Sequence, residues 1–327
     1  MDKTRLAGFL VRANAFAPFR YFNRTKLPVL MYHRFSESEE FGKTSRRNLR
    51  QHLVYLTKHY KVVSLTEAVS SLAQGRSLPV RSAVITIDDG YRDFHETAFP
   101  VLKEFSVPAT LYVVTDFVGG KCWIWTDVAR FILLEAMVGT VRLQIDGKLI
   151  EKVLNGTESR LRAAGSINSE LKKLPDAEKD GVLIDLAKSM KVEVPAVPPA
   201  TFAPLRWDQA REMAGSGIEI GSHTVSHPIL TNVDAPRLDM ELRNSRSEIE
   251  NELQRENIHF CYPNGNVSER ERNAVEKAGY ASAVTTQISL CENGADKFLI
   301  PRIDAEPQLQ RFVQATSGFD SFKSRVR

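Results

Sequence analysis

The sequence predicts an α/β fold with a largely parallel sheet, and two patterns carry that prediction. Short apolar runs alternate with helical patterns over most of the 327 residues. Most of these runs are apolar almost throughout, as expected for strands buried on both faces of a parallel sheet. Repeated strand–helix units of this kind build either a barrel or an open sheet.

The predicted elements follow one another in a regular order. Strands are predicted at 27–33, 83–88, 109–115, 218–222, 259–262 and 281–285. Helices are predicted near 46–59, 66–74, 95–106, 207–216, 235–256 and 268–279. Two of the helices begin with a capping box, which pairs Ser64 with Glu67 in one case. The other pairs Ser268 with Glu271, and Gly279 lies where the same helix should end.

Residues 120–205 interrupt this order. They are predicted to contain a hairpin, two polar helices and a proline-rich extended stretch, over 141–151, 157–173, 176–190 and 194–204. Asp146 and Gly147 favour a type I′ turn in the hairpin. We interpret 120–205 as a cap segment inserted into a main domain that spans 27–327. The cap either contributes to substrate binding or is structural padding.

Composition excludes several classes of protein. A hydrophobic share of 43% and a charged share of 26% are typical of globular proteins, not of disordered or fibrous ones. The net charge of +4 suits an anionic glycan, a lipid phosphate or a membrane surface without choosing among them. No cluster of lysine and arginine indicates a nucleic-acid partner. Cys122, Cys261 and Cys291 form no CxxC pair, which predicts free thiols.

The first 26 residues predict a basic amphipathic segment. They contain six Lys or Arg and one Asp, and their apolar residues recur at helical spacing before Pro18. Such a helix can make peripheral contact with an anionic membrane, although docking on its own domain is an alternative. No apolar stretch has the ~18 residues of a membrane span, and arginines interrupt any signal peptide. We therefore expect a cytoplasmic location, with membrane association left open.

Two adjacent carboxylates, Asp88 and Asp89, follow the predicted strand 83–88 and precede Gly90. In parallel α/β folds the carboxyl ends of strands face the active site. One carboxylate could bind a metal ion while the other handles protons, and a cation would relieve their repulsion. An Asp-Asp-Gly sequence is also common in plain turns.

His223 and His227 follow the predicted strand 218–222 at a spacing of four residues. Two histidines so spaced can ligate one ion, although a solvated pair is the alternative. One carboxylate and two imidazoles make a three-ligand site with an open position. A metal in such a site lowers the pKa of bound water to about 7.

Two further strand ends carry candidate residues. His33 ends the first predicted strand and could act as a general acid if a barrel closes, although a structural histidine is the alternative. Asn264 lies in a Pro-Asn-Gly turn after the strand 259–262. The exposed backbone N–H groups of that turn could stabilise an oxyanion, or the segment could be an ordinary turn.

These motifs resemble the signatures of the polysaccharide deacetylase family (NodB homology, carbohydrate esterase 4). The resemblance rests on residues 86–90, 223–227 and 262–265, and it covers roughly 28–120 and 205–305. It implies a distorted (β/α) barrel with an inserted cap segment. It also implies a metal-dependent hydrolase that removes acetyl groups from amino sugars or O-acetylated glycans.

The resemblance also assigns roles to individual residues. Asp88 becomes the general base, and Asp89, His223 and His227 become the ligands of a divalent metal, most often Zn²⁺. Water activated at the metal, with help from Asp88, attacks the acetyl carbonyl. The backbone N–H of Asn264 helps to hold the oxyanion.

Two features depart from the commonest pattern of the family. Many members take their acid from a histidine near the C-terminal end of the domain, where this chain has none. Residues 30–33 instead resemble the permuted subset that includes poly-N-acetylglucosamine deacetylases, in which the first strand supplies the acid, here His33. The third motif usually carries an arginine that steadies the aspartate, and here Cys261 replaces it. Arg302 could fill that place from another strand, or be a surface arginine.

The motifs leave other functions open. The chain could hydrolyse another amide, such as a formamide on a lipid-linked sugar, or bind glycans without turnover. The sugar, the acyl group, N- or O-linkage and the oligomeric state are not specified by the sequence.

Overall fold

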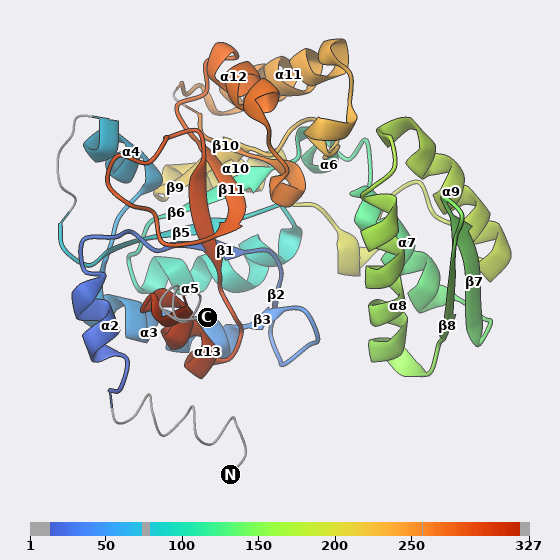
Figure 1. Cartoon of the computed structure of the whole chain (residues 1–327), viewed down its shortest axis with the longest axis horizontal. Coiled ribbons are helices and arrows are strands. Elements are labelled where there is room, and N and C mark those ends of the chain that lie inside the picture. Colours follow the sequence, from blue (N-terminus) through green and yellow to red (C-terminus); the bar gives the residue numbers. More distant parts are fainter. Residues whose placement is uncertain (1–13, 74–78, 257, 321–327) are drawn as a thin grey trace.

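The computed structural model describes residues 14–73, 79–256 and 258–320, and it shows a barrel beside a smaller lobe (Figure 1). Half of the predicted basic segment, residues 1–13, lies outside these residues. Its last part forms helix α2 (Ala17–Phe22). The rings of Phe16 and Phe19 pack against Phe319, with centroids 5.7 and 4.9 Å apart, so the two ends of the described chain meet. None of the helices described is both long enough and apolar enough to cross a membrane.

Seven parallel strands close into a barrel. The sheet has eight strands in the order β1-β12-β11-β10-β9-β6-β5-β4, and β1 also pairs with β5, which closes the circuit and leaves β4 outside it. The strands are β1 (Val29–Tyr32), β4 (Lys61–Val62), β5 (Ser82–Ile87), β6 (Ala109–Val113), β9 (Ile218–Ser222), β10 (Phe260–Cys261), β11 (Ala283–Ile288) and β12 (Ile300–Asp304). This arrangement confirms the predicted (β/α) barrel.

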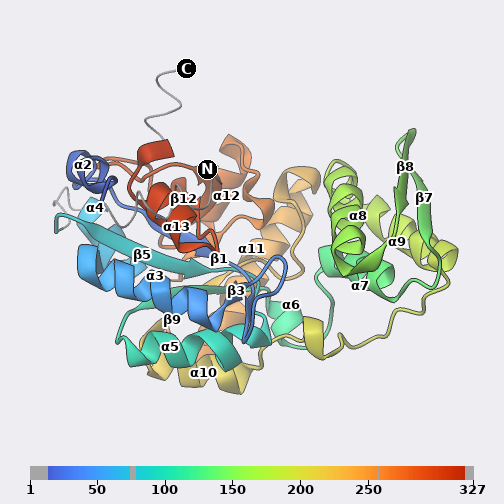
Figure 2. The same ribbon diagram turned by 90° about the horizontal axis from the view of Figure 1, so that it is seen from below.

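Helices surround the barrel (Figure 2). They are α3 (Arg46–His59), α4 (Leu65–Ala73), α5 (Phe99–Glu104), α6 (Thr115–Val118), α10 (Trp207–Gly215), α11 (Ala235–Leu253), α12 (Glu269–Lys277) and α13 (Leu309–Thr316). A short parallel pair, β2 (Phe35–Ser36) and β3 (Thr44–Ser45), follows β1. The capping box at Ser268 is formed as predicted, with the Glu271 side chain accepting from the Ser268 amide at 2.8 Å.

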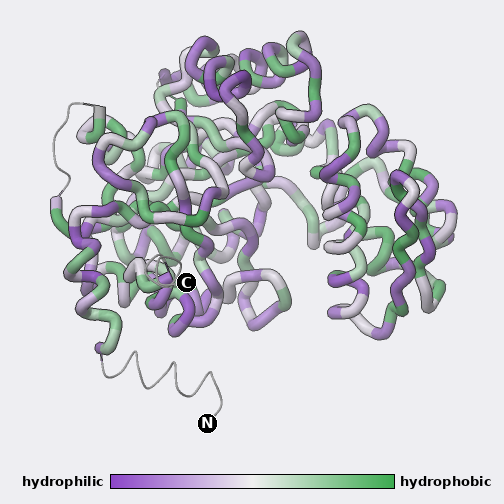
Figure 3. Tube along the Cα trace, viewed as in Figure 1, coloured by the Kyte–Doolittle hydropathy of each residue, from purple (hydrophilic) through white to green (hydrophobic). Residues whose placement is uncertain are grey.

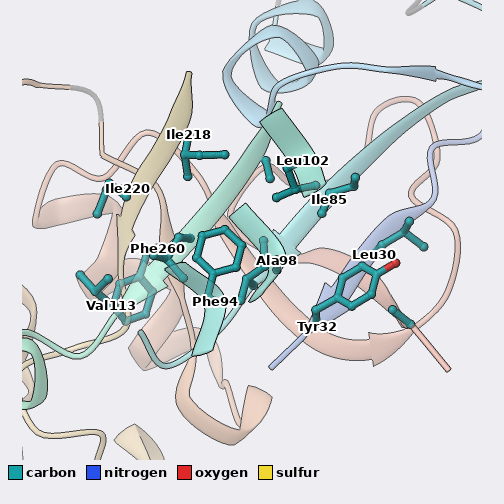
Figure 4. Close-up of a cluster of buried hydrophobic side chains, with 14 of the residues drawn as sticks. Leu30, Tyr32, Ile85, Phe94, Ala98, Leu102, Val113, Ile218, Ile220 and Phe260 are labelled. Carbon is teal, nitrogen blue, oxygen red and sulfur yellow. The ribbon is translucent and has the colours of Figure 1, made fainter. Parts of the chain in front are cut away.

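Most strands of the barrel are apolar on both faces, because one face packs in the barrel interior and the other packs against the surrounding helices. Figure 4 shows side chains from several strands, including Leu30, Ile85 and Phe260, packed with residues of α5 and of the π-helical turn that precedes it at Phe94–Ala98. All are buried. Burial of a side chain of this size contributes about 1.5–3 kcal/mol of transfer free energy. Gly221 lets β9 approach its neighbours, because a Cβ there would lie 2.6 Å from the Tyr112 ring.

One predicted helix has a different form. The helix expected over 95–106 begins with a π-helical turn at Phe94–Ala98 and continues as α5. Pro100 has no N–H to donate to the carbonyl of Glu96, so the regular ladder cannot run through this point. That carbonyl accepts from Arg46 at 3.3 Å instead.

The inserted segment forms the lobe, which lies at one end of the molecule in both views (Figures 1 and 2). It contains α7 (Trp125–Glu135), β7 (Thr140–Ile145), β8 (Lys148–Val153), α8 (Gly156–Leu171) and α9 (Asp176–Met190). Asp146 and Gly147 have φ of 45° and 74°, as a type I′ turn requires. Hydrophobic and hydrophilic residues alternate along its helices (Figure 3). Its buried apolar side chains form a separate cluster, which also takes in Ile229.

Candidate metal and catalytic site

Three strand ends bring the candidate side chains together. Asp88 follows β5, His223 follows β9 and His33 follows β1. Because the strands are parallel, their carboxyl ends open at one mouth of the barrel. The ladder continues one residue past two of the strands. The Asp88 amide donates to Tyr32 at 2.9 Å, and the His223 amide donates to Val113 at 2.8 Å.

Asp89, His223 and His227 form a compact set of potential metal ligands. Their ligand atoms all lie within 4.8 Å of one another, and all three residues are buried. The Nε2 atoms of both histidines lie 3.5 Å from Oδ1 of Asp89. Nδ1 of His223 lies 2.7 Å from the carbonyl oxygen of Cys261. A proton on Nδ1 donated to that carbonyl leaves the Nε2 lone pair facing Asp89.

The protonation states favour a cation at this set. Burial lowers the pKa of His223 and His227, so both imidazoles are neutral near pH 7. Burial raises the pKa of Asp89, because a charged carboxylate is poorly solvated there. One carboxylate and two neutral imidazoles are the donors that Zn²⁺ and similar divalent ions prefer. The residues present therefore fit a divalent metal.

A second set, Asp88, His223 and Cys261, has a similar spacing but fits a metal less well. A thiol binds zinc as the thiolate. Burial raises the pKa of Cys261 well above its ordinary value, so the sulfur stays protonated. Each oxygen of Asp88 already accepts a hydrogen bond from Arg302, and the positive charge of that guanidinium disfavours a metal cation beside it. The set containing Asp89 is the better candidate.

Unusual backbone conformations aim these side chains. Asp89, Thr224 and His227 have φ of 77°, 73° and 62°, in the left-handed region that non-glycine residues seldom occupy. Glu241 of α11 holds the loop between the histidines, and it is fully buried. Its carboxylate accepts from the amides of Val225 at 2.7 Å and of Ser226 at 3.0 Å.

Sequence reasoning missed Glu241. The only available signal was a carboxylate on the apolar face of a predicted helix. Such a residue needs buried hydrogen-bond partners, but the sequence does not say which.

Arg302 lies against Asp88. Its two terminal nitrogens each donate to one oxygen of the Asp88 carboxylate at 2.7 Å. The guanidinium is fixed further by the carbonyl of Thr285 at 2.9 Å and by Thr86 Oγ1 at 3.1 Å. Cys261 contacts the same pair, with its sulfur 3.2 Å from Arg302. Arg302 therefore binds Asp88 from β12. This is the contact expected of an arginine that takes over from the one replaced by Cys261 on β10.

The ion pair sets the charge of Asp88. Burial alone would raise its pKa, but the charge and the hydrogen bonds of Arg302 outweigh burial and lower the pKa of Asp88 well below its usual range. Asp88 is therefore ionised at any ordinary working pH. Two adjacent carboxylates thus have pKa values displaced in opposite directions, a pattern that is typical of reaction centres.

His33 lies on the open side of Asp88. Its Nε2 is 3.6 Å from Oδ2 of Asp88, and its side chain is 46% exposed while that of Asp88 is 2% exposed. A half-exposed imidazole beside a buried carboxylate can exchange protons with both solvent and a bound substrate.

Asn264 takes the turn conformation that the sequence predicts. Its φ is 58°, in a short 3₁₀ turn at Pro263–Gly265. Gly265 is required there, because a Cβ would lie 1.9 Å from Thr286 Oγ1. The side-chain amide of Asn264 donates to Asn266, and its carbonyl oxygen accepts from Thr286, but within the described part of the chain its backbone N–H donates no hydrogen bond. Among the described residues, this backbone N–H has no acceptor, so it can donate to a ligand.

Replacing His223 with alanine is expected to remove stoichiometric metal from the protein, since a ligand with a fixed tautomer is lost. Metal per chain, measured by mass spectrometry after dialysis, checks this. His95→Ala is the matched control, because His95 pairs with Glu212 at 2.9 Å outside this set. Unchanged metal in His223→Ala would remove His223 from the ligands.

A parallel (β/α) barrel with an Asp-His-His set and an arginine-bound aspartate at its mouth has the residues that metal-assisted hydrolysis requires. A family model described as polysaccharide deacetylase matches residues 75–283. The chain belongs to the polysaccharide deacetylase family.

Similar proteins agree with this assignment. YxkH of Bacillus subtilis, itself named for the family, is 22% identical over 283 residues, which cover 86% of this chain and 72% of that protein. Poly-beta-1,6-N-acetyl-D-glucosamine N-deacetylase of Escherichia coli K12 is 34% identical over 71 residues, 21% of this chain and 11% of that protein. The fold is similar to that of the Streptococcus pyogenes deacetylase PplD, with a TM-score of 0.60 and 17% sequence identity. The similarity covers 89% of this chain and 98% of that one.

Proposed function

We propose that this protein is a divalent-metal-dependent hydrolase that removes acetyl groups from an acetylated sugar or glycan. The observation that carries the proposal is the placement of the Asp89, His223 and His227 ligand atoms within 4.8 Å of one another beside Asp88. A general base and a metal set at one barrel mouth serve attack of water on an acyl carbon.

Asp89, His223 and His227 would hold the metal, most simply Zn²⁺. Bound there, the ion supplies Lewis acidity toward the acyl carbonyl and lowers the pKa of water. Asp88, kept ionised by Arg302, accepts a proton from the attacking water at its Oδ2 edge, which faces His33. Arg302 holds the carboxylate plane so that this edge stays aimed at the mouth of the barrel.

Two other groups complete the reaction. His33 in its protonated form donates a proton to the departing amine or alkoxide, because its Nε2 reaches both the Asp88 carboxylate and solvent. The free amide of Asn264 donates to the oxyanion that forms on the acyl oxygen. Neither task needs a side chain of the lobe.

The similar proteins support an amino sugar as the substrate. The E. coli protein is named for N-deacetylation of poly-beta-1,6-N-acetyl-D-glucosamine. A Staphylococcus aureus protein of the same name is 32% identical over 88 residues, which cover 26% of this chain. Because these matches cover only part of the chain, they support the proposed chemistry more than a particular polymer.

One assay tests the proposal. The Zn²⁺-loaded protein is incubated with a panel of N- and O-acetylated sugars, oligosaccharides and lipid-linked sugars, and released acetate is measured. Acetate release that disappears with a chelator and returns with Zn²⁺ is the expected result. Formate release from a formylated sugar without acetate release would make the enzyme a deformylase. Binding without release of either acid would make it a glycan-binding protein.

Replacing His33 with alanine is expected to slow acetate release about 100-fold or more, the usual cost of losing a general acid. The metal content should stay at one ion per chain, because no ligand is lost. His95→Ala again serves as the control. Loss of metal in His33→Ala would instead make His33 a ligand, and full activity would remove it from the reaction.

A further inference from the structure

The lobe touches the candidate metal set directly. Nε1 of Trp125 in α7 donates to the carbonyl oxygen of His227 at 3.1 Å. The side chain of Asn232, which follows the histidine loop, donates to the carbonyl of Lys172 at 3.0 Å. The start of α7 and the residue after α8 are therefore fixed beside the loop that carries the two histidines.

One of these charges belongs to Arg130 of α7. Its NH1 donates to Asp127 at 2.7 Å, and the other oxygen of Asp127 accepts from the hydroxyl of Tyr91 at 2.5 Å. Asp127 is 1% exposed, whereas the side chain of Arg130 is 41% exposed. Among the described residues, NH2 of Arg130 has no partner. Both oxygens of Asp127 thus already accept hydrogen bonds, whereas the guanidinium of Arg130 can still donate to a ligand.

The other charge belongs to Lys172, the residue after α8. It is half-buried and forms no ion pair with any residue in the described ranges. Burial lowers the pKa of Lys172, the positive charge of Arg130 lowers it further, and Asp89 opposes this. These influences agree with the geometry, because Asn168, one turn before Lys172 in α8, donates to the carbonyl of Thr126 in α7 at 2.9 Å. An ammonium held in this way, without its own carboxylate, is stabilised by an anion.

The neighbouring lysine shows the contrast. Lys173 lies on the surface and pairs with Glu170 at 2.7 Å, and its side chain is 66% exposed. Within the described ranges, a carboxylate therefore pairs with Lys173 and none pairs with Lys172.

We propose that Lys172 and Arg130 form a subsite for an anionic group, a phosphate or a carboxylate, on the acetylated substrate. The sugar part of this substrate rests on the proposed function, whereas the preference for an anionic group rests on Lys172 and Arg130 alone. Arg130 pairs with the buried Asp127, whereas Lys172 has no ion-pair partner among the described residues, so the two cations carry one more charge than the lobe carboxylate beside them. The guanidinium fork suits the paired oxygens of either group. The lobe thus selects acidic sugars over neutral ones.

Binding to matched sugars tests the subsite. Zn²⁺-loaded wild type, Lys172→Met and Lys173→Met are titrated by calorimetry with three probes: N-acetylglucosamine, N-acetylglucosamine 1-phosphate and N-acetylmuramic acid. Methionine keeps the apolar stem and removes the charge. Direct contact of the anions with zinc is the same in all three proteins, so differences between them report the lysine.

The wild type is expected to bind an anionic probe more tightly than the neutral one. Lys172→Met should weaken that binding about fivefold, as for the loss of one partly exposed ion pair. Lys173→Met and the neutral probe should show no change, and Lys172→Arg should restore affinity. A loss confined to the phosphate or to the carboxylate probe identifies the acidic group.

Two results would overturn the subsite. One is a wild type that binds neither anionic probe more tightly than the neutral sugar. The other is a Lys172→Met variant that loses the same affinity for every probe, or for none. Acetate release is scored separately. A preference for anionic probes without acetate release would support the subsite and contradict the proposed deacetylase activity. Acetate release without that preference would support the activity and contradict the subsite.

Discussion

Replacing Arg302 with methionine is expected to reduce acetate release about 100-fold or more, because the Asp88 carboxylate would lose its fixed position. In enzymes, a displacement of ~1 Å in a reacting group can cost that much. Arg302 is fully buried and Asp88 is 2% exposed, so the substitution leaves a buried charge without its partner. Removing one member of a buried pair typically lowers the free energy of unfolding by about 3–5 kcal/mol. Arg302→Lys should recover only part of the activity, since an ammonium cannot donate to both oxygens in parallel.

The pH dependence of this loss has a defined sign. In the wild type the pKa of Asp88 is lowered. Its contribution to stability is therefore present above the unfolded-state pKa of about 3.9 and is lost only as the pH falls through the lower folded-state value. In Arg302→Met, burial raises that pKa. The difference in unfolding free energy between the two proteins should narrow as the pH falls from 7 toward 4. The acid limb of activity should move to higher pH.

A double variant separates charge from packing. If an unpaired carboxylate causes the damage, Arg302→Met with Asp88→Asn should unfold at a higher denaturant concentration than Arg302→Met alone. Arg243→Met is the surface control. Arg243 pairs with Asp239 at 2.7 Å with its side chain 52% exposed, and losing such a pair costs about 1 kcal/mol or less. An Arg302→Met variant with normal activity would show that Asp88 needs no fixed partner.

The fold could be predicted because its signals are local. Most strands of the barrel are runs of apolar residues, and each predicted strand overlaps an observed one, with Ile218–Ser222 matching at both ends. The strand β12 was not predicted, because Arg302 and Asp304 interrupt its apolar residues. Closure of the barrel could not be derived from those runs. It depends on the pairing of β1 with both β5 and β12, and that pairing joins residues far apart in the chain. The family resemblance supplied what the patterns alone left open.

The candidate site could be located because its residues stand at strand ends, where parallel topology brings them to one mouth. Its supporting contacts could not. Arg302 reaches Asp88 across 214 positions, and the sequence offered only an arginine of uncertain exposure. Lys172 looks like any lysine at the end of a polar helix. That no carboxylate of the described residues pairs with it becomes visible only when the lobe is folded against the histidine loop.

Replacing Asp88 with asparagine is expected to abolish most acetate release, by about 100-fold or more, while the protein keeps its metal. The reason is geometric. The metal set uses Asp89, and Asp88 Oδ1 and Oδ2 face Arg302. An amide keeps the shape of the side chain but cannot accept the proton from water. It also places a donor against the Arg302 guanidinium, so some loss of stability should accompany the loss of activity.

Asp93→Asn provides the matched control. Asp93 is another mostly buried aspartate bound to an arginine, with its Oδ2 2.7 Å from Nε of Arg34, but it lies outside the metal set. Asp93→Asn should lower stability about as much as Asp88→Asn but should release acetate at nearly the wild-type rate. That result would show that breaking an Asp–Arg pair does not by itself stop the reaction. Asp88→Asn must then retain one metal ion per chain, measured on the same samples used for activity. If it loses the metal, Asp88 belongs to the ligands, and if it keeps its activity, the proton goes to another group, for which His33 is the nearest candidate.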